Sequence, residues 1–115
     1  MAAGRDFYDE QIRLLEEKNI DGIVDHYHPE ATLVGFDVTV KGRDALREHF
    51  IGYLDHLGSL KLISTDKFTE TDDSIFFEAT VETNLGVAKV YDVFVLDDGR
   101  ATHHFTGVIS VSPKE

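Results

Sequence analysis

Two side chains that can exchange a proton, Asp92 and His104, lie in consecutive strand-like segments near the end of this 115-residue chain. An Asp-Asp-Gly sequence separates the two segments. If it forms a three-residue turn, Leu96 pairs with Arg100, and Asp92 then lies directly opposite His104. The Cβ atoms of such neighbours are within ~5.5 Å, so the carboxylate can orient the imidazole.

Strand alternation assigns this pair to a face. Asp92 shares its face with Val90 and Phe94, and His104 shares its face with Thr106. The same face is apolar on the neighbouring segments, so it matches the apolar stripes of the expected helices. An acid–base pair in an apolar cavity is typical of general acid–base catalysts, although a cross-strand Asp–His pair can also be a structural hydrogen bond.

Further side chains are expected around the pair. Gln11 falls within an apolar helical stripe, so a polar group faces inward. Gln11 and Tyr27 could donate hydrogen bonds to a substrate oxygen, or could only satisfy one another at helix ends. The residues expected to contact a ligand are Gln11, Tyr27, His49, Phe50, Tyr53, Phe77, Val81, Val90, Phe94 and Thr106.

Metal and nucleophile chemistry find little support in the sequence. His26 and His28 flank one residue, and His103 adjoins His104, but helical and strand geometry place the members of each pair on different sides. The chain has no Cys, no Gly-x-Ser-x-Gly motif and no glycine loop that cradles phosphate. We therefore expect neither a metal site nor a cofactor.

The composition excludes further classes of function. The 22 Asp and Glu residues outnumber 11 Lys and Arg, giving a net charge of −11, and this disfavours nucleic acid and anionic membranes as partners. No apolar run approaches the ~18 residues of a membrane span, and the first residues do not form a signal peptide. Together with the absence of Cys, this predicts a cytoplasmic protein of one domain, residues 1–115.

Three helices are expected in the first half of the chain and strands in the second. The expected helices run from a cap at Asp6 to about Lys18, from Asn19 or Asp21 to Pro29 with Tyr27 on the buried side, and from a cap at Asp44 to Gly58. The expected strands are a short hairpin within Ala31 to Val40, then Leu60 to Phe68, Ser74 to Thr83, Val87 to Leu96 and Ala101 to Val111. This order predicts an α+β domain with helices on one face of a bent antiparallel sheet.

The other face of the sheet is also apolar and needs cover. It presents Phe76, Tyr91, Val93, Val95, Phe105 and Ile109. A second copy of the chain, related by two-fold symmetry, would cover it, so we predict a homodimer through this outer sheet face.

Three segments carry a resemblance to a known family. They are Asn19-Ile20-Asp21-Gly22-Ile23-Val24 followed by Tyr27 and Pro29-Glu30-Ala31-Thr32, then Gly42-Arg43-Asp44-Ala45-Leu46, then Tyr91-Asp92-Val93-Phe94 before Asp98-Gly99-Arg100. In this order and spacing the chain resembles the NTF2-like superfamily, in particular its SnoaL-like and ketosteroid-isomerase-like small proteins. The resemblance implies a cystatin-like, cone-shaped α+β fold, a mixed edge to the sheet, a dimer and a cavity inside the cone.

The resemblance also implies roles for particular residues. The sheet acid of ketosteroid isomerases falls on Asp92 and a supporting tyrosine on Tyr27, but the base position falls on Gly35, two residues from Asp37, and the first-helix tyrosine position on Gln11. Steroid isomerisation by that set of residues is therefore not expected. SnoaL-like cyclases use a sheet aspartate with a nearby histidine, which Asp92 and His104 fit better.

The leading hypothesis is a cofactor-independent enzyme that abstracts a proton from a hydrophobic small molecule, leading to cyclisation, isomerisation or dehydration. Asp92 would be the base and His104 would orient it or exchange protons with it. The alternative is a binding or protein-interaction module without chemistry, expected to have a closed or wholly apolar cavity. An epoxide-hydrolase-like site would need an Arg beside Asp92, and Arg43 and Arg100 lie at element ends.

Overall fold

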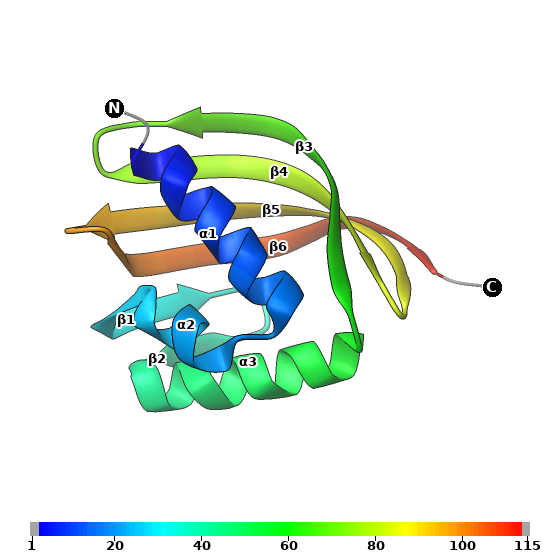
Figure 1. Cartoon of the computed structure of the whole chain (residues 1–115), viewed down its shortest axis with the longest axis horizontal. Coiled ribbons are helices and arrows are strands. Elements are labelled where there is room, and N and C mark those ends of the chain that lie inside the picture. Colours follow the sequence, from blue (N-terminus) through cyan, green and yellow to red (C-terminus); the bar gives the residue numbers. More distant parts are fainter. Residues whose placement is uncertain (1–2, 114–115) are drawn as a thin grey trace.

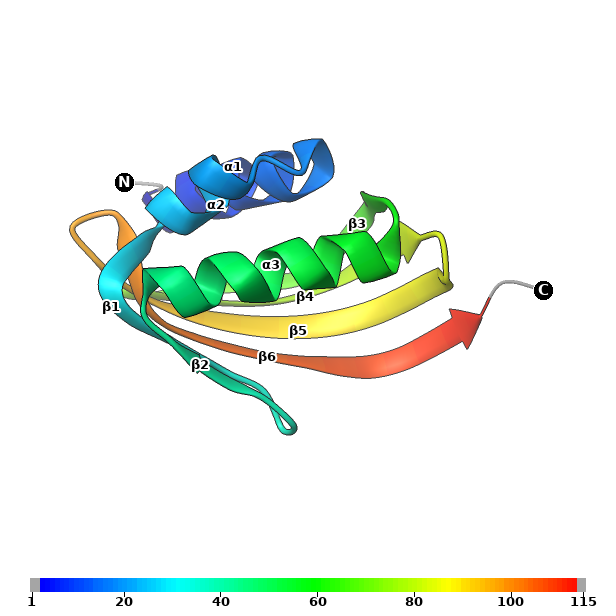
Figure 2. The same ribbon diagram turned by 90° about the horizontal axis from the view of Figure 1, so that it is seen from below.

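A bent six-stranded sheet forms one layer of the molecule, and three helices cover its concave face (Figures 1 and 2). The structure is a computed structural model that describes residues 3–113. In chain order the elements are α1 Ala3–Glu17, α2 Ile20–Asp25, β1 Tyr27–Val34, β2 Thr39–Lys41, α3 Arg43–Leu57, β3 Leu60–Glu70, β4 Ser74–Thr83, β5 Gly86–Asp97 and β6 Arg100–Pro113. This confirms the expected α+β domain.

The strands lie in the order β2-β1-β6-β5-β4-β3, so the short N-terminal hairpin joins the edge of the long meander. β1 runs parallel to β6, and every other pairing is antiparallel. The sheet is therefore mixed at this edge, as the resemblance implied.

The helix ends follow the expected signals at three positions and differ at two. Asn19 caps α2 by accepting from the Gly22 amide, and Lys18 and Gly58 adopt left-handed backbone angles at the ends of α1 and α3. Asp6, expected to cap α1, lies inside its first turn. Asp44, expected to cap α3, also lies in the first turn because Gly42 is the cap. Both carboxylates still favour the positive end of the helix dipole.

The second helix is shorter than expected. It ends at Asp25, and Tyr27 opens β1 instead of belonging to the helix. Pro29, expected to stop the helix, lies inside β1 between Tyr27 and Thr32, where the register with β6 shifts. Proline cannot donate a ladder hydrogen bond, so an irregular stretch of strand tolerates it. The helical spacing of Tyr27 from Ile23 and Val24 was thus misleading.

The pairing of β5 with β6 differs from the expected register. Asp97 pairs with Arg100, and Asp98 and Gly99 form a two-residue turn with φ of 53° and 78°. Left-handed angles at both positions are typical of tight hairpins. A register shift follows between Val95 and Leu96, so His104 lies opposite Phe94 and not opposite Asp92.

The core lies between the helices and the concave face of the sheet. Its fully buried side chains include Tyr8, Ile23, Tyr27, Leu46, Ile75 and Phe94. No helix within residues 3–113 combines the length and the apolar character needed to cross a membrane.

Candidate functional site

A cavity of about 480 Å³ lies between the helices and the concave face of the sheet. We call it the cone cavity. It is lined by Gln11, Ile12, Leu15, Leu33, Gly35, Phe36, Asp37, Val38, His49, Phe50, Tyr53, Leu60, Phe77, Ala79, Val81, Val90, Asp92, Phe94, His104, Thr106, Gly107 and Val108. Most of these side chains are apolar, and few polar groups interrupt them, which is typical of a small-molecule site.

Asp92 and His104 meet in this cavity. The Nε2 atom of His104 lies 2.7 Å from Oδ1 of Asp92, and the two side chains are only 7% and 13% exposed. Asp92 pairs with Thr106, so His104 is its diagonal neighbour across the two strands, within reach of these side chains. His104 also stacks on Phe94 with ring centroids 3.8 Å apart. The expected contact therefore forms, although the expected direct pairing does not.

A hydrogen-bond chain continues from the other side of the imidazole. The Tyr27 hydroxyl lies 2.8 Å from Nδ1 of His104, and Gln11 donates to that hydroxyl through Nε2 at 3.4 Å. The Oε1 atom of Gln11 lies 2.8 Å from Nδ1 of His26. Five side chains, from α1, the residue between α2 and β1, the start of β1 and the two C-terminal strands, thus form one continuous hydrogen-bond chain. A histidine whose second nitrogen is bonded in this way has a fixed ring orientation.

Burial and the charge of Asp92 control the ionisation of the surrounding groups. Complete burial, and then the Asp92 charge, hold the pKa of Tyr27 well above its usual value, so Tyr27 remains a neutral hydroxyl. Desolvation, and then Asp92, raise the pKa of Tyr53 to about 12. Burial, and then the neighbouring His104, lower the pKa of His49. His49 and Tyr53 stack along α3 and offer two neutral polar groups to the cavity.

The structure places all but one of the residues expected from the sequence on the wall of the cone cavity. The exception is Tyr27, which is completely buried behind His104 and does not line the cavity. Gln11 lines it but is 2% exposed and bonded at both ends of its amide. Tyr27 and Gln11 thus bond to one another, as one of the two alternatives from the sequence had it, and direct contact of Tyr27 with a ligand stays a prediction.

Sequence reasoning missed two parts of the site. The turn between β1 and β2 contributes Phe36 and Asp37 to the cavity wall, because this hairpin joins the edge of the sheet beside β6. His26 was considered only as a metal ligand, and nothing in its spacing indicates the contact with Gln11. The sequence offered one signal for the β1–β2 turn: the family resemblance placed a base position at Gly35, two residues from Asp37.

Within residues 3–113, Arg43 and Arg100 do not line the cone cavity. Arg43 donates two hydrogen bonds to the Tyr27 carbonyl, and Arg100 donates to the Asp25 carbonyl, so both arginines tie elements together. Within residues 3–113, no group of three His, Asp or Glu side chains is arranged to hold a metal ion.

Comparisons with known proteins agree with this architecture. A profile of the SnoaL-like domain matches residues 5–104. No curated protein matches the chain.

Many solved structures share the fold. An NTF2-like protein from Anabaena variabilis has a TM-score of 0.86 at 13% identity, covering 99% of this chain and 92% of that one. A putative polyketide cyclase from Sinorhizobium meliloti has a TM-score of 0.78 at 13% identity, covering 89% and 94%. TerC, co-crystallised with polyporic acid, has a TM-score of 0.77 at 17% identity, covering 92% and 91%.

Proposed function

Because the chain belongs to the SnoaL-like domain family, we propose that it is a small enzyme that performs acid–base chemistry, without a cofactor, on a hydrophobic molecule bearing a carbonyl group. The observation that carries this proposal is the buried contact between Nε2 of His104 and Oδ1 of Asp92 on the wall of a largely apolar cavity. A carboxylate and an imidazole held in such surroundings are suited to moving a proton at carbon.

Asp92 is the proton acceptor in this mechanism. Its bond to His104 occupies Oδ1, so Oδ2 accepts the proton of a C–H bond beside the substrate carbonyl. The electron pair of that bond moves toward the carbonyl oxygen and forms an enolate. Where a conjugated double bond extends the enolate, its far carbon takes the proton back from Asp92, which is isomerisation. Where the molecule has a second carbonyl group, the enolate carbon attacks that carbonyl carbon, the electron pair of its C=O bond moves to the oxygen, and this oxygen takes the proton from Asp92 as the ring closes.

The developing negative charge on the substrate oxygen needs a hydrogen-bond donor. Tyr53 and His49 are suited to this role because both line the cavity and both are neutral near pH 7, given the directions of their pKa shifts. Tyr27, whose hydroxyl is held between Gln11 and His104, instead fixes the imidazole from behind.

The alternative of a binding module without chemistry predicts a different environment for Asp92. In that case Asp92 would be bonded to the backbone and shielded from the cavity. In residues 3–113 it instead lines the cavity and bonds to an imidazole. This observation favours the enzyme.

Hydrogen–deuterium exchange tests the proposal without knowledge of the natural substrate. The probe is 2-tetralone, a bicyclic aromatic ketone with acidic C–H bonds beside its carbonyl, followed by NMR in D₂O. We expect the protein to accelerate exchange, and Asp92→Asn to lower that acceleration at least ~100-fold, the usual contribution of a general base. His104→Ala should also lower it, whereas Asp55→Asn, exposed on α3 and outside both cavities, should have no effect.

Two results would contradict the enzyme. One is exchange that persists in both Asp92→Asn and His104→Ala. The other is saturable binding of 2-tetralone in the cavity, seen as chemical-shift changes around Phe94, with no acceleration of exchange by the unmodified protein. The second result would support the binding module.

We also propose that the chain forms a homodimer through its outer sheet face. Phe76, Val93 and Phe105 lie opposite one another on three adjacent strands, and Phe76 and Phe105 are 47% and 39% exposed. A continuous apolar row of this kind is typical of an interface. A location in the cytoplasm stays a prediction.

A further inference from the structure

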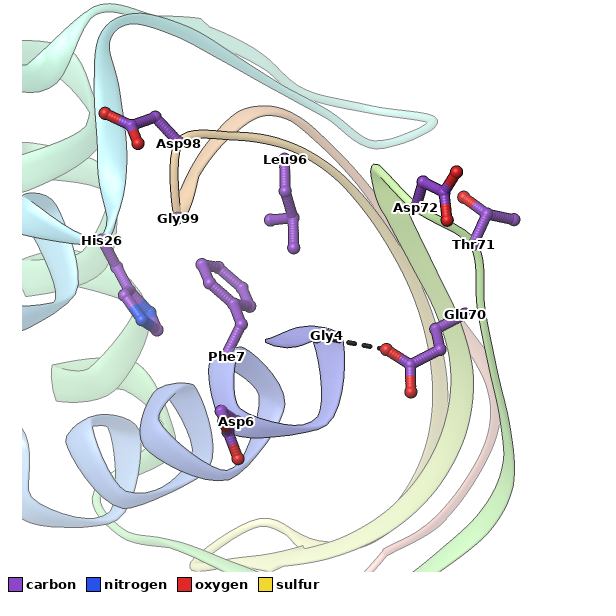
Figure 3. Close-up of a pocket in the computed structure, with 10 residues that line it drawn as sticks. All are labelled: Gly4, Asp6, Phe7, His26, Glu70, Thr71, Asp72, Leu96, Asp98 and Gly99. Carbon is purple, nitrogen blue, oxygen red and sulfur yellow. Dashed lines mark hydrogen bonds between the residues drawn. The ribbon is translucent and has the colours of Figure 1, made fainter. Parts of the chain in front are cut away.

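A second cavity, of about 730 Å³, lies at the start of α1 and shares no lining residue with the cone cavity (Figure 3). His26 and Phe7 both line it, and their rings stack with centroids 3.9 Å apart. Leu96 adds an apolar side chain, and the turn between β5 and β6 closes one side at Gly99. Because His26 is also bonded to Gln11, the hydrogen-bond chain from Asp92 ends at this second cavity.

The hydrogen-bond chain has a direction because its central members, Gln11, Tyr27 and His104, are buried and each has a limited number of hydrogens. Gln11 presents Nε2 to Tyr27, so the Tyr27 oxygen accepts there and its single hydrogen is donated to Nδ1 of His104. His104 therefore carries its proton on Nε2, where it is donated to Asp92. At the other end, Oε1 of Gln11 accepts from Nδ1–H of His26.

A proton gained by His104 is incompatible with this direction. An imidazolium donates from both nitrogens, so Nδ1 would donate to Tyr27. The Tyr27 hydrogen must then turn to Gln11, which can accept only through its oxygen. The amide therefore turns over and presents Nε2 to His26, whose Nδ1 must now be an acceptor.

We propose that the direction of this hydrogen-bond chain reverses as a unit. When His104 becomes an imidazolium, His26 changes tautomer, so that its proton is on Nε2, at the second cavity, instead of Nδ1. The proton balance is simple: His26 loses one proton and gains one by exchange with water, and His104 gains one. Gln11 and His26 are thus positioning residues. While both histidines are neutral, the hydrogen-bond chain keeps the His104 proton on Nε2, the nitrogen that faces Asp92.

The charges around the two histidines are compatible with this assignment. Those around His26 are Glu10 of α1, Asp25 with its partner Arg100, and the cavity-lining carboxylates Asp6, Glu70, Asp72 and Asp98. Those around His104 are Asp92, Tyr27, His49 and Tyr53. Burial, against the opposing charges of Glu10 and Asp25, lowers the pKa of His26, so its neutral form, which has two tautomers, is the relevant one.

The reversal also limits the positive charge that His26 and His104 can carry at the same time. A cationic His26 needs the single amide oxygen of Gln11, and a cationic His104 needs the same oxygen through Tyr27. Both imidazoles can be cationic together only if a buried hydrogen is left without an acceptor, which is unfavourable. By linkage, a ligand in the second cavity that favours one form of His26 shifts the protonation of His104.

The consequence for catalysis rests on the proposed function, but the reversal itself can be observed without substrate. The experiment is an acid titration of the full chain with ¹⁵N-labelled histidine, following the ring nitrogens by NMR. At neutral pH we expect an unprotonated Nδ1 in His104 and a protonated Nδ1 in His26. As His104 gains its proton, the Nδ1 signal of His26 should change to the unprotonated type at the same midpoint.

Gln11→Glu is the matched variant, since its carboxylate accepts from both neighbours and needs no reversal. In Gln11→Glu the His26 Nδ1 proton should persist while His104 gains its proton, so that both imidazoles become cationic together. His103, on the opposite face of β6, is the internal control. A His26 Nδ1 that stays protonated through the His104 titration of the unmodified chain overturns the proposal, even if Gln11→Glu does not fold.

Discussion

Tyr27→Phe removes only the hydroxyl that joins Gln11 to His104. The tyrosine is completely buried and its hydroxyl makes bonds of 2.8 Å to His104 and 3.4 Å to Gln11. A net hydrogen bond contributes about 0.5–1.5 kcal/mol, and a buried polar atom left without a partner costs about 1–3 kcal/mol. Since the bond to Gln11 is long, we expect most of the effect to come from the lost bond to His104. The free energy of unfolding should fall by about 2 kcal/mol.

The expected effect is large enough to measure by urea denaturation. With an m-value of about 1.5 kcal/mol/M, the midpoint should fall by about 1.3 M. At about 2.1 cal/mol/K per residue, the 115-residue chain has an unfolding entropy of about 240 cal/mol/K, so the melting temperature should fall by about 8 °C. Protein concentration must be equal in all samples, because self-association would itself shift the midpoint.

Tyr53→Phe is the control for this prediction. It removes a phenol hydroxyl that lines the cone cavity, from a side chain that is 38% exposed. Among residues 3–113 that hydroxyl makes no hydrogen bond, so we expect a change below about 0.5 kcal/mol. If both variants unfold at the same urea concentration, or if Tyr27→Phe is as stable as the unmodified chain, Tyr27 is not the structural support of His104.

Two further predictions concern pH and assembly. Burial lowers the pKa of His26 in the folded chain below its ordinary 6.5, so the unfolded chain binds a proton first as the pH falls, and folding stability is lost from about pH 6.5 downward. His26→Phe should reduce the difference between urea midpoints at pH 7.5 and 5.5, and an unchanged difference would show that His26 is not its source. Phe105→Glu should convert a micromolar dimer to monomer in sedimentation velocity, whereas Ile51→Glu, exposed on α3, should not. An unmodified chain that sediments only as a monomer would argue against the proposed dimer.

The sequence was most informative where one physical signal acts alone. Helix ends at Lys18 and Gly58, and the cap at Asn19, follow from local backbone chemistry. Tyr27 is a different case, since its spacing from Ile23 and Val24 indicated a helix and Pro29, two residues later, indicated the end of that helix. Pairing with Ala101 of β6 and the two hydrogen bonds from Arg43 to its carbonyl instead hold Tyr27 in a strand. Those partners are distant in sequence, so no local pattern reports them.

In the candidate site, too, some features follow from local sequence patterns and others depend on contacts between distant residues. Alternation of apolar residues was sufficient to place Phe77, Val90 and Phe94 on the cavity wall. When one face of a sheet is buried, only one of the two alternating sets of residues in each strand can point to that face. The contact of His26 with Gln11 depends on how α1 crosses the residue between α2 and β1. That crossing follows from the packing of the whole core, and the histidine therefore had no recognisable signal in the sequence.

The register of β5 and β6 at His104 differs from the expected one by two residues, an even displacement that keeps the imidazole on the expected face. The turn is one residue shorter than expected, and a bulge at Thr102 then adds one residue to β6, held by a hydrogen bond from its hydroxyl to the Val95 carbonyl. Without that bulge, His104 would lie opposite Val93 and would point to the outer face, because opposite residues share a face. The inward position of His104 thus depends on one extra residue in β6. A bulge that redirects a side chain next to a cavity is typical of a functional site, and here it brings an imidazole to Asp92.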